Sequence, residues 1–322
     1  MKFLTVNEAV ELLKQGEVVA IPTETVYGLA ADARNDEAVA KIFTAKGRPA
    51  DNPLIVHIGD IAQVDGLVTA VTPAARILME HFWPGPLTII LPSAGTVSKL
   101  VSAGLSTVGI RMPAHPLTLS LLRDSGIPLA APSANLSGKP SPTKASHVAA
   151  DLVGKVQGIL DGGTCDIGLE STVIDMTTEV PTILRPGGVS RTAIESALGR
   201  PVQIATGIID QPKAPGMKYT HYAPDAEVYI VDGSNEYFTK TITEFHKKGM
   251  RIGILCSEPA SMEIPGITVA KGLEKGKNLY AALREFDEEN IDVILCEYQN
   301  DEAIMNRLLK ASEERVLREV EN

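Results

Sequence analysis

The sequence predicts an α/β fold in two parts, a large domain with a mixed sheet and a small domain with a parallel sheet. The chain has 322 residues, more than one hydrophobic core usually organises. Short apolar runs alternate with helical stretches along its whole length. A segment at residues 206–224 is rich in Pro and Gly and shows neither the periodicity of a strand nor that of a helix. We therefore expect domains at residues 1–205 and 225–322, joined by a linker at 206–224 that folds as a lid over the site.

The first domain is expected to begin with a helix and to continue through many strands. Thr5 and Glu8 have the spacing of a capping box, and Gly16 ends the helix that follows them. A strand is expected at residues 17–22. Further strands are expected at "PLIVHI", "LTIILP", "STVGIRM", "IPLAAP", "STVIDM" and "PTILRP", with helices near residues 36–45, 72–82, 116–125 and 190–198. So many strands in one domain predict a large sheet.

The second domain alternates strands and helices regularly. Strands are expected at "AEVYIV", "MRIGILC", "ITVAK" and "IDVILC", with helices near residues 234–248, 277–289 and 300–312. This alternation is typical of a small parallel α/β domain. No GxGxxG pattern follows its first strand, so the sequence does not indicate a dinucleotide site there.

Composition limits the functional classes. No apolar run reaches the roughly eighteen residues of a membrane span, and a net charge of −10 argues against strong, passive binding of nucleic acid. Cys165, Cys256 and Cys296 are too far apart to indicate a disulfide framework or a metal site. Glu8 and Glu11 interrupt the apolar core that a signal peptide needs. We expect a cytoplasmic protein with no membrane partner, no metal site and no tightly held cofactor.

Six polar clusters in the first domain stand at the ends of expected strands. They are "PTETVYGL", "KGRPADNP", "STVGIRMP", "APSANLSGKPSP", "GLESTV" and "LRPGGVS". Turns of this composition present hydroxyl and backbone N–H groups to phosphate oxygens, and Arg and Lys neutralise the charge. A single such cluster is more often an ordinary turn. Six together indicate the rim of a ligand site.

A specific resemblance follows from these clusters. "PTETVYGLA", "KGRPADNPL" with His57 after it, "GIRMP", "SANLSG" and "LRPG", in that order, resemble the YrdC-like domain of the threonylcarbamoyl-AMP synthases. "KYTHYAP" and the small domain after it resemble the long, two-domain form of that family, so the resemblance covers essentially the whole chain. It implies a large twisted mixed-sheet YrdC-like domain followed by a small Rossmann-like parallel α/β domain.

The resemblance also implies an activity, that of an L-threonylcarbamoyladenylate synthase, a nucleotidyltransferase. Such an enzyme converts L-threonine, bicarbonate and ATP to threonylcarbamoyl-AMP and pyrophosphate, for the threonylcarbamoyl-adenosine modification of tRNA. ATP is then a substrate, accompanied by Mg²⁺. The expected partners are the tRNA threonylcarbamoyl-transfer machinery and, through a weak contact, tRNA itself. The chemistry depends on positioning and charge neutralisation, so no serine nucleophile is required.

The family's site residues are carried over onto the matching positions. The residues expected to bind ATP are Lys46, Arg48, Asn52, Thr107, Ser133, Asn135, Ser141, Arg185 and Tyr222. Those expected to bind L-threonine are Thr25, His57, Arg111, Ala131 and Ser171. Lys46 and Arg48 are the expected catalytic groups, two cations on an exposed rim that face the triphosphate, with Arg48 as the bidentate fork.

Several alternatives stay open. His57, within an apolar strand, also fits a satisfied core histidine, Arg111 a salt bridge at the rim, and Tyr222 simple packing between the domains. A carbamoyl-transfer enzyme of the hydrogenase-maturation type uses a related domain, but it adds an acylphosphatase-like domain and cysteine-rich zinc motifs that this sequence does not show. A non-catalytic RNA-binding module is disfavoured by the acidic charge and by the scarcity of aromatic residues among the basic clusters.

Overall fold

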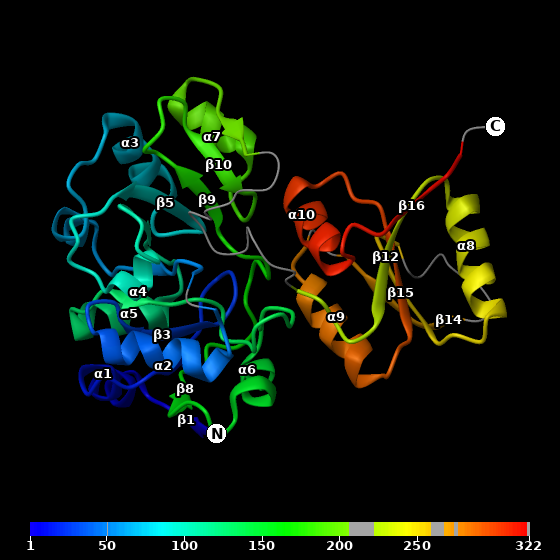
Figure 1. Ribbon diagram of the computed structural model, residues 1–322, viewed down its shortest axis with the longest axis horizontal. Helices are drawn as coiled ribbons and strands as arrows, with labels where there is room; N and C mark the ends of the chain where they lie inside the picture. Colours follow the sequence, from blue (N-terminus) through cyan, green and yellow to red (C-terminus); the bar gives the residue numbers. More distant parts are fainter. Residues whose placement is uncertain (50, 206–221, 259–266, 274–275, 321–322) are drawn as a thin grey trace. The chain divides into compact units, whose positions relative to one another are not determined.

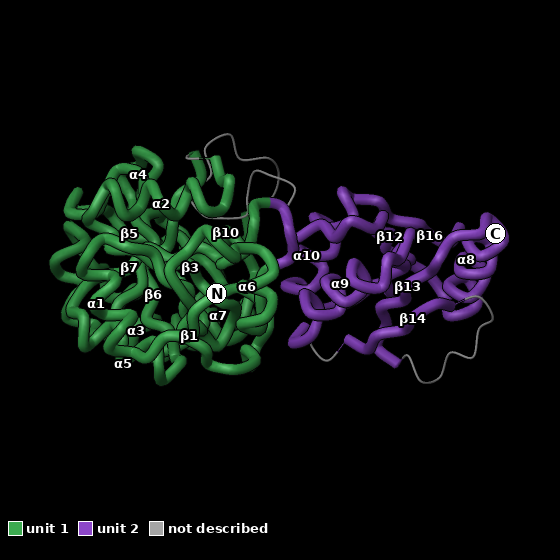
Figure 2. Tube along the Cα trace, turned by 90° about the horizontal axis from the view of Figure 1, so that it is seen from below, with its two compact units in different colours: residues 1–137, 141–219 green, residues 138–140, 220–322 purple. Residues whose placement is uncertain are grey.

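The computed structural model describes residues 1–322 apart from 50, 206–221, 259–266, 274–275 and 321–322 (Figure 1). The described chain forms two compact units. The first holds residues 1–137 and 141–219, and the second holds residues 138–140 and 220–322 (Figure 2). The sequence did not predict that Gly138–Pro140 would belong to the second unit. Most of the linker expected at 206–224 lies outside the described residues, as does the lid expected there.

The first unit is built on one large mixed sheet. In sequence order its elements are β1 (Lys2–Phe3), α1 (Val6–Lys14), β2 (Val19–Ile21), β3 (Gly28–Asp32), α2 (Asp36–Lys46), β4 (Ile55–His57), the 3₁₀ helix η1 (Ile61–Gly66), α3 (Pro73–Phe82), β5 (Leu87–Pro92), α4 (Lys99–Ser102), β6 (Thr107–Arg111), α5 (Pro116–Ser125), β7 (Leu129–Ala130), α6 (Ala145–Leu152), β8 (Gly158–Ile159), β9 (Thr172–Asp175), β10 (Thr182–Arg185), α7 (Arg191–Leu198) and β11 (Gln203–Ile204). Among the described residues, eleven strands pair in the order β1-β8-β2-β3-β7-β4-β6-β5-β9-β10-β11. The large mixed sheet that the sequence predicted is therefore confirmed.

Local sequence signals account for several helix boundaries. The predicted capping box of Thr5 and Glu8 is present at the start of α1. Asn35 caps α2 by accepting from two backbone N–H groups, and Gly47 ends it with a φ of 61°, a conformation that favours glycine. Ser190 caps α7 by accepting from Ala193 N. The turn at Gly47 lies between Lys46, the last residue of α2, and Arg48, and so determines where these two side chains are placed.

Strand register places the expected site residues on one face of the sheet. His57 of β4 lies opposite Arg111 of β6, and Ile55 lies opposite Gly109. Ile90 of β5 lies opposite the same Gly109. Because directly opposed side chains share a face and alternate residues along a strand do too, these side chains all point to one side.

The same face continues across two further strands. Thr88 of β5 lies opposite Val173 of β9, and Val173 lies opposite Arg185 of β10. Ile55, Ile90 and Val173 form a small apolar cluster of their own. The main core contains the intervening residues of these strands, Val56, Ile89, Val108, Ile110 and Ile174, and therefore lies on the other side of the sheet. The small cluster is the apolar floor of the face that carries the candidate site.

The second unit has a separate, parallel sheet. Its elements are β12 (Glu227–Asp232), α8 (Asn235–Lys247), β13 (Ile252–Cys256), β14 (Ile267–Gly272), α9 (Leu279–Glu288), β15 (Val293–Glu297), α10 (Glu302–Ala311) and β16 (Val316–Arg318). Its described strands pair in the order β14-β13-β15-β12-β16, with parallel pairing throughout. The prediction of a small parallel α/β domain is confirmed. No helix within the described residues is both long and apolar enough to span a bilayer.

Candidate active site

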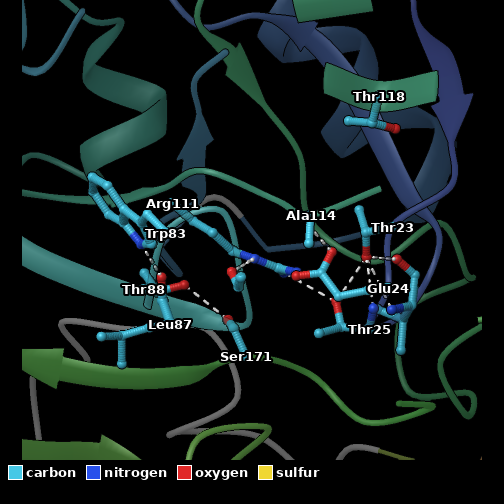
Figure 3. Close-up of polar contacts among 12 residues, drawn as sticks. Thr23, Glu24, Thr25, Trp83, Leu87, Thr88, Arg111, Ala114, Thr118 and Ser171 are labelled. Atoms are coloured by element: carbon cyan, nitrogen blue, oxygen red, sulfur yellow. Dashed lines mark hydrogen bonds and ion pairs between the residues drawn. The ribbon is translucent and has the colours of Figure 1, made fainter. Parts of the chain in front are cut away.

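Arg111, at the end of β6, is buried at the centre of a polar cluster (Figure 3). Its Nη2 lies 2.6 Å from Glu24 Oε1, its Nη1 donates to Thr25 Oγ1 at 3.0 Å, and its Nε donates to Gly85 O at 3.1 Å. The arginine is 4% exposed, so the alternative of a salt bridge at the rim does not describe it. Thr25 and Arg111, both expected in the threonine site, are brought together.

Glu24 is a member of this cluster that the sequence analysis did not single out. Its second carboxylate oxygen, Oε2, accepts from Ala114 N at 3.0 Å, and its carbonyl accepts from Ile167 N at 2.8 Å. The signal that could have found it is its place in "PTETVYGL", one of the six polar clusters. An acidic residue in a threonine-rich turn ordinarily suggests exposure to solvent.

The turn that carries Thr25 is fixed by its own hydrogen bonds. Thr23 Oγ1 accepts from the backbone N–H groups of Thr25 and Val26, at 3.1 Å each, and lies 2.7 Å from Thr25 Oγ1. Thr118 Oγ1, from α5, donates to Pro22 O at the start of the turn. The hydroxyl of Thr25 is therefore held in one place beside Arg111.

His57 is buried next to this cluster. Burial, reinforced by the positive charge of Arg111, lowers the pKa of His57 to about 3, so its imidazole is neutral at physiological pH. Within the part of the chain that the structure describes, its Nδ1 has no hydrogen-bond partner. A fully satisfied core histidine would not leave that nitrogen unpaired. Ala131, also expected in the threonine site, adjoins the same strand, since its N–H donates to Ile55 O at 3.0 Å.

Ser171 is held by residues from two neighbouring strands. Its Oγ lies 2.8 Å from Thr88 Oγ1. Arg185 Nη2 donates to Ser171 O at 2.9 Å and to its Oγ at 3.2 Å. The structure thus brings together one residue expected to bind threonine and one expected to bind ATP. Thr88, which the sequence analysis missed, reaches this site because the strand register turns it to the same face as Arg111.

The prediction that Lys46 stands on an exposed rim is wrong. The residue is 2% exposed, and its ammonium group donates to Asn135 O at 2.6 Å and to Ser133 O. The side chain turns inward at the end of α2 because two carbonyl groups of the 133–135 turn offer it acceptors. Arg48, one residue beyond Gly47, is half-buried, and its Nη2 makes long contacts to Asn52 O (3.4 Å) and Pro53 O (3.5 Å).

Asn52, Asn135 and Ser141, which are also expected to bind ATP, are buried, and Ser133 is partly buried. Ser141 Oγ donates to Glu170 Oε1 at 2.6 Å. Glu170 directly precedes Ser171 in the chain. Asn135 Nδ2 donates to Leu136 O at 2.8 Å. Asn52 is 1% exposed, and its Oδ1 has no hydrogen-bond partner among the described residues. Backbone pairing links Ser133 to Gly28, close to the Thr25 turn.

Thr107 lies apart from this cluster within the first unit. Thr107 begins β6, so it shares the face of Arg111 but lies about 13 Å from it along the strand. It lines a cavity of about 580 Å³ together with Thr69, Pro92, Ser93, Leu105, Ser106 and Thr177. Tyr222 belongs to the second unit, where its ring stacks on Tyr280 with a centroid separation of 5.2 Å. Arg307 Cζ lies 5.9 Å from the same ring.

Comparison with known proteins identifies the family of this chain. A family model described as "Telomere recombination" matches residues 11–187, and one described as "Threonylcarbamoyl-AMP synthase, C-terminal domain" matches residues 189–313. The chain is 50% identical to a threonylcarbamoyl-AMP synthase of Bacillus subtilis, over 97% of this chain and 94% of that protein. The chain belongs to the threonylcarbamoyl-AMP synthase family. The resemblance seen in its motifs is thereby confirmed, and the chain is an enzyme.

Further relatives extend this result across both units. The threonylcarbamoyl-AMP synthase of Pyrococcus abyssi is 46% identical over 96% of this chain and 94% of that protein. A crystal structure of P. abyssi Sua5 complexed with L-threonine matches with a TM-score of 0.92 and 44% identity, covering 98% of this chain and 96% of that one. The similarity to the threonylcarbamoyl-AMP synthase family therefore includes the second unit as well as the first.

Proposed function

We propose that this protein forms threonylcarbamoyl-AMP and pyrophosphate from L-threonine, bicarbonate and ATP, for the threonylcarbamoyl-adenosine modification of tRNA. The observation that carries the proposal is the match to threonylcarbamoyl-AMP synthases over 97% of the chain. The buried site supports it, because one face of the sheet gathers cationic and hydrogen-bonding groups around an apolar floor. Such a site suits a reaction that brings several anions together.

The threonine half of the site is proposed at Arg111. Its guanidinium group is suited to the amino-acid carboxylate. The Thr25 hydroxyl accepts from Arg111, and the Ser171 hydroxyl contacts Thr88, whose side chain shares the sheet face of Arg111. Neutral His57 offers its unpaired Nδ1 to the amine or the hydroxyl of threonine. Ala131 is small enough to leave room for the substrate's methyl group. A P. abyssi relative is described as a complex with L-threonine, which supports this half of the proposal.

The ATP half is proposed beside the turns that carry Lys46 and Arg48. We assign to it the remaining predicted residues, Asn52, Thr107, Ser133, Asn135, Ser141, Arg185 and Tyr222. The threonine amine first adds to carbon dioxide derived from bicarbonate and loses a proton, which gives a carbamate. A carbamate oxygen then forms a bond to the α-phosphorus as the bond to the β-phosphate oxygen breaks, and pyrophosphate leaves. The protein's contribution is to align the carbamate with that bond and to neutralise the phosphates.

The donor set near the site does not form a cage for Mg²⁺. Glu24 is bound to Arg111 and Ala114, and Glu170 accepts from Ser141. Within the described residues no group of three or more His, Cys, Asp or Glu side chains could hold a metal ion. A Mg²⁺ ion that accompanies ATP would be held by phosphate oxygens and water.

The setting of the reaction is also part of the proposal. We place the enzyme in the cytoplasm, as the donor of an activated threonylcarbamoyl group to the machinery that transfers it to tRNA, with a weak contact to tRNA itself. We further propose residues 1–205 as the catalytic domain, 206–224 as a lid and 225–322 as the accessory domain.

Release of pyrophosphate from ATP tests the proposal directly. We expect release to require both L-threonine and bicarbonate, and the nucleotide product to carry the threonylcarbamoyl group by mass spectrometry. Release that is indifferent to threonine would contradict the proposal. Filter binding of tRNA in parallel distinguishes the enzyme from an RNA-binding module, for which tight RNA binding would accompany an inactive chain.

A further inference from the structure

The contacts of Arg111 leave a defined part of its guanidinium group for a ligand. Arginine carries five N–H donors in a planar fork. Three are used by Gly85 O, Thr25 Oγ1 and Glu24 Oε1. Among the described residues no further partner occupies the other two, one on Nη1 and one on Nη2. Two N–H groups, one on each terminal nitrogen, are the number that a bidentate carboxylate requires.

Glu24 determines how that fork is turned. Its Oε1 binds Nη2 at 2.6 Å while its Oε2 accepts from Ala114 N at 3.0 Å, so the carboxylate is held from both sides (Figure 3). Ala114 follows β6 by three residues, and Glu24 lies in the turn before β3. The carboxylate therefore ties the Thr25 turn to the end of the strand that carries Arg111. Any displacement of it would release one side of the fork.

Glu24 also sets the charge of the pocket. The side chains of Glu24 and Arg111 are 9% and 4% exposed. The negative charge of Glu24 therefore compensates the guanidinium charge of Arg111 in a region where solvent screens little. A ligand then gains less from the net charge of Arg111 than from the direction of its free N–H groups. That arrangement suits the single carboxylate of an amino acid better than a triphosphate, which carries several charges and is attracted most by uncompensated cations.

We propose that Glu24 is a positioning residue for the amino-acid carboxylate: it aims the two remaining N–H groups of Arg111 and neutralises the pocket so that a monocarboxylate binds there. The inference rests on the proposed function for the identity of the amino acid. It goes beyond that function by assigning selection between the carboxylate and the phosphates to a residue that contacts neither. The competing interpretation is that Glu24 and Arg111 form a buried ion pair that only stabilises the fold.

The test compares two ligands that differ only in the carboxylate. Dissociation constants for L-threonine and L-threoninamide are measured by isothermal titration calorimetry for the wild-type protein, Glu24→Gln and Glu17→Gln. The last is the matched control, because Glu17 also pairs with a cation, Lys41 at 2.8 Å, but on a partly exposed surface. We expect the wild type and the control to prefer threonine equally. In Glu24→Gln the preference should fall by about tenfold or more, since Arg111 and Ala114 N–H donate to different carboxylate oxygens and the NH2 group of Gln would place a donor against one of them.

The outcomes separate positioning from the alternatives. If Glu24 served only the fold, Glu24→Gln would weaken both ligands alike and the preference would not change. If it only reduced the positive charge, the preference for threonine would rise. Either result overturns the proposal. Should Glu24→Gln fail to fold by circular dichroism, Glu24→Asp, which keeps the charge but withdraws it by one methylene, is used instead and should lose part of the preference. A wild-type protein that binds no threonine would refute the proposed function rather than this inference.

Discussion

His57 shows at the scale of one residue how burial determines chemistry. Its imidazole sits in an apolar strand beside a guanidinium group, and both circumstances disfavour its charged form. The neutral ring keeps a hydrogen-bonding nitrogen for a ligand without adding charge to the pocket. This neutrality has a cost in stability at acidic pH, which can be measured.

We expect the free energy of unfolding to fall as the pH drops below about 6.5. The pKa of His57 is about 3 in the folded protein, against an ordinary value of 6.5, so between these values the unfolded chain binds a proton that the folded chain does not. Stability contributed by the neutral ring is complete above pH 6.5 and is lost toward pH 3, by up to about 1.4 kcal/mol per pH unit. Urea unfolding of wild type and His57→Asn at pH 7, 6 and 5 measures this. If the free energy of unfolding depended on pH in the same way in both proteins, His57 would not titrate as expected.

Lys46 should be important for stability as well as for activity. Lys46→Met keeps the length of the side chain but leaves the carbonyl groups of Ser133 and Asn135 without the ammonium group. We expect the unfolding free energy to fall by about 1–3 kcal/mol and pyrophosphate release to be nearly lost. Arg48→Gln, at a half-buried position with long contacts, should reduce activity with a loss of less than about 1 kcal/mol. Equal stability losses in the two variants would contradict this assignment.

At the scale of elements, the site depends on close approaches between backbone segments. Gly187, in the turn after β10, passes directly over the segment that carries Ser171. A Cβ atom there would lie 2.3 Å from Glu170 O and 2.5 Å from Ser171 C. Only glycine allows these two segments to lie so close, and the same approach lets Arg185 reach the carbonyl of Ser171.

Gly187→Ala should therefore displace Ser171 and destabilise the protein. Overpacking against backbone atoms costs about 1–3 kcal/mol, and we expect a higher KM for threonine in the same variant. Gly66→Ala is the matched control, because a Cβ atom at Gly66 would meet no atom within 4 Å. Thermal unfolding and threonine-dependent pyrophosphate release measure both effects. A Gly187→Ala protein that matched the control would mean that the turn can move away freely.

Elements with a local signal could be predicted, and those without one could not. Helices α2, α3, α5 and α7 lie at their predicted places because caps and apolar periodicity are local properties. Strands β1, β8 and β11 have two residues each, too few to show an alternation, whereas the equally short β7 lies within the apolar run "IPLAAP" that predicted it. The order of strands in the sheet depends on pairing between distant segments, which no local pattern encodes.

The site residues divide in the same way. The motifs named Arg111, His57 and Ser171 as candidates, but they did not single out Glu24, whose partner Arg111 lies 87 residues away. Its burial could not be predicted either, because a carboxylate is buried only where the fold supplies a counter-charge. The inward turn of Lys46 was missed for a similar reason: its acceptors belong to a turn more than eighty residues further on.

The whole molecule consists of two units of which the second is discontinuous in sequence. Gly138 O accepts from Ala223 N at 3.0 Å, and Pro140 O accepts from Arg284 Nη2 at 2.6 Å. Arg284 comes from α9 and is buried. Ser141, a predicted ATP contact, follows Pro140 directly in the chain. The second unit thus fixes the residues that immediately precede a part of the candidate site.

Residues 1–205 expressed alone should fold but should not be active. The fragment retains the main core and the large sheet, while residues 138–140 lose their partners and Tyr222 is absent. We expect cooperative unfolding by circular dichroism together with a loss of pyrophosphate release of at least about tenfold. A fragment that made threonylcarbamoyl-AMP at the rate of the full chain would show that the second unit is dispensable for the reaction.

The short segment Gly138–Pro140 has a consequence for exchanging domains between members of this family. A chimaera with a single junction near residue 220 would combine a second unit from one parent with the three residues of the other. Those residues meet Ala223 and Arg284, so the mismatch would fall inside a folded unit rather than at its edge. A transplant of the C-terminal domain is complete only if Gly138, Lys139 and Pro140 are exchanged together with it. The second unit is therefore encoded by two separated stretches of the gene that have to be replaced jointly.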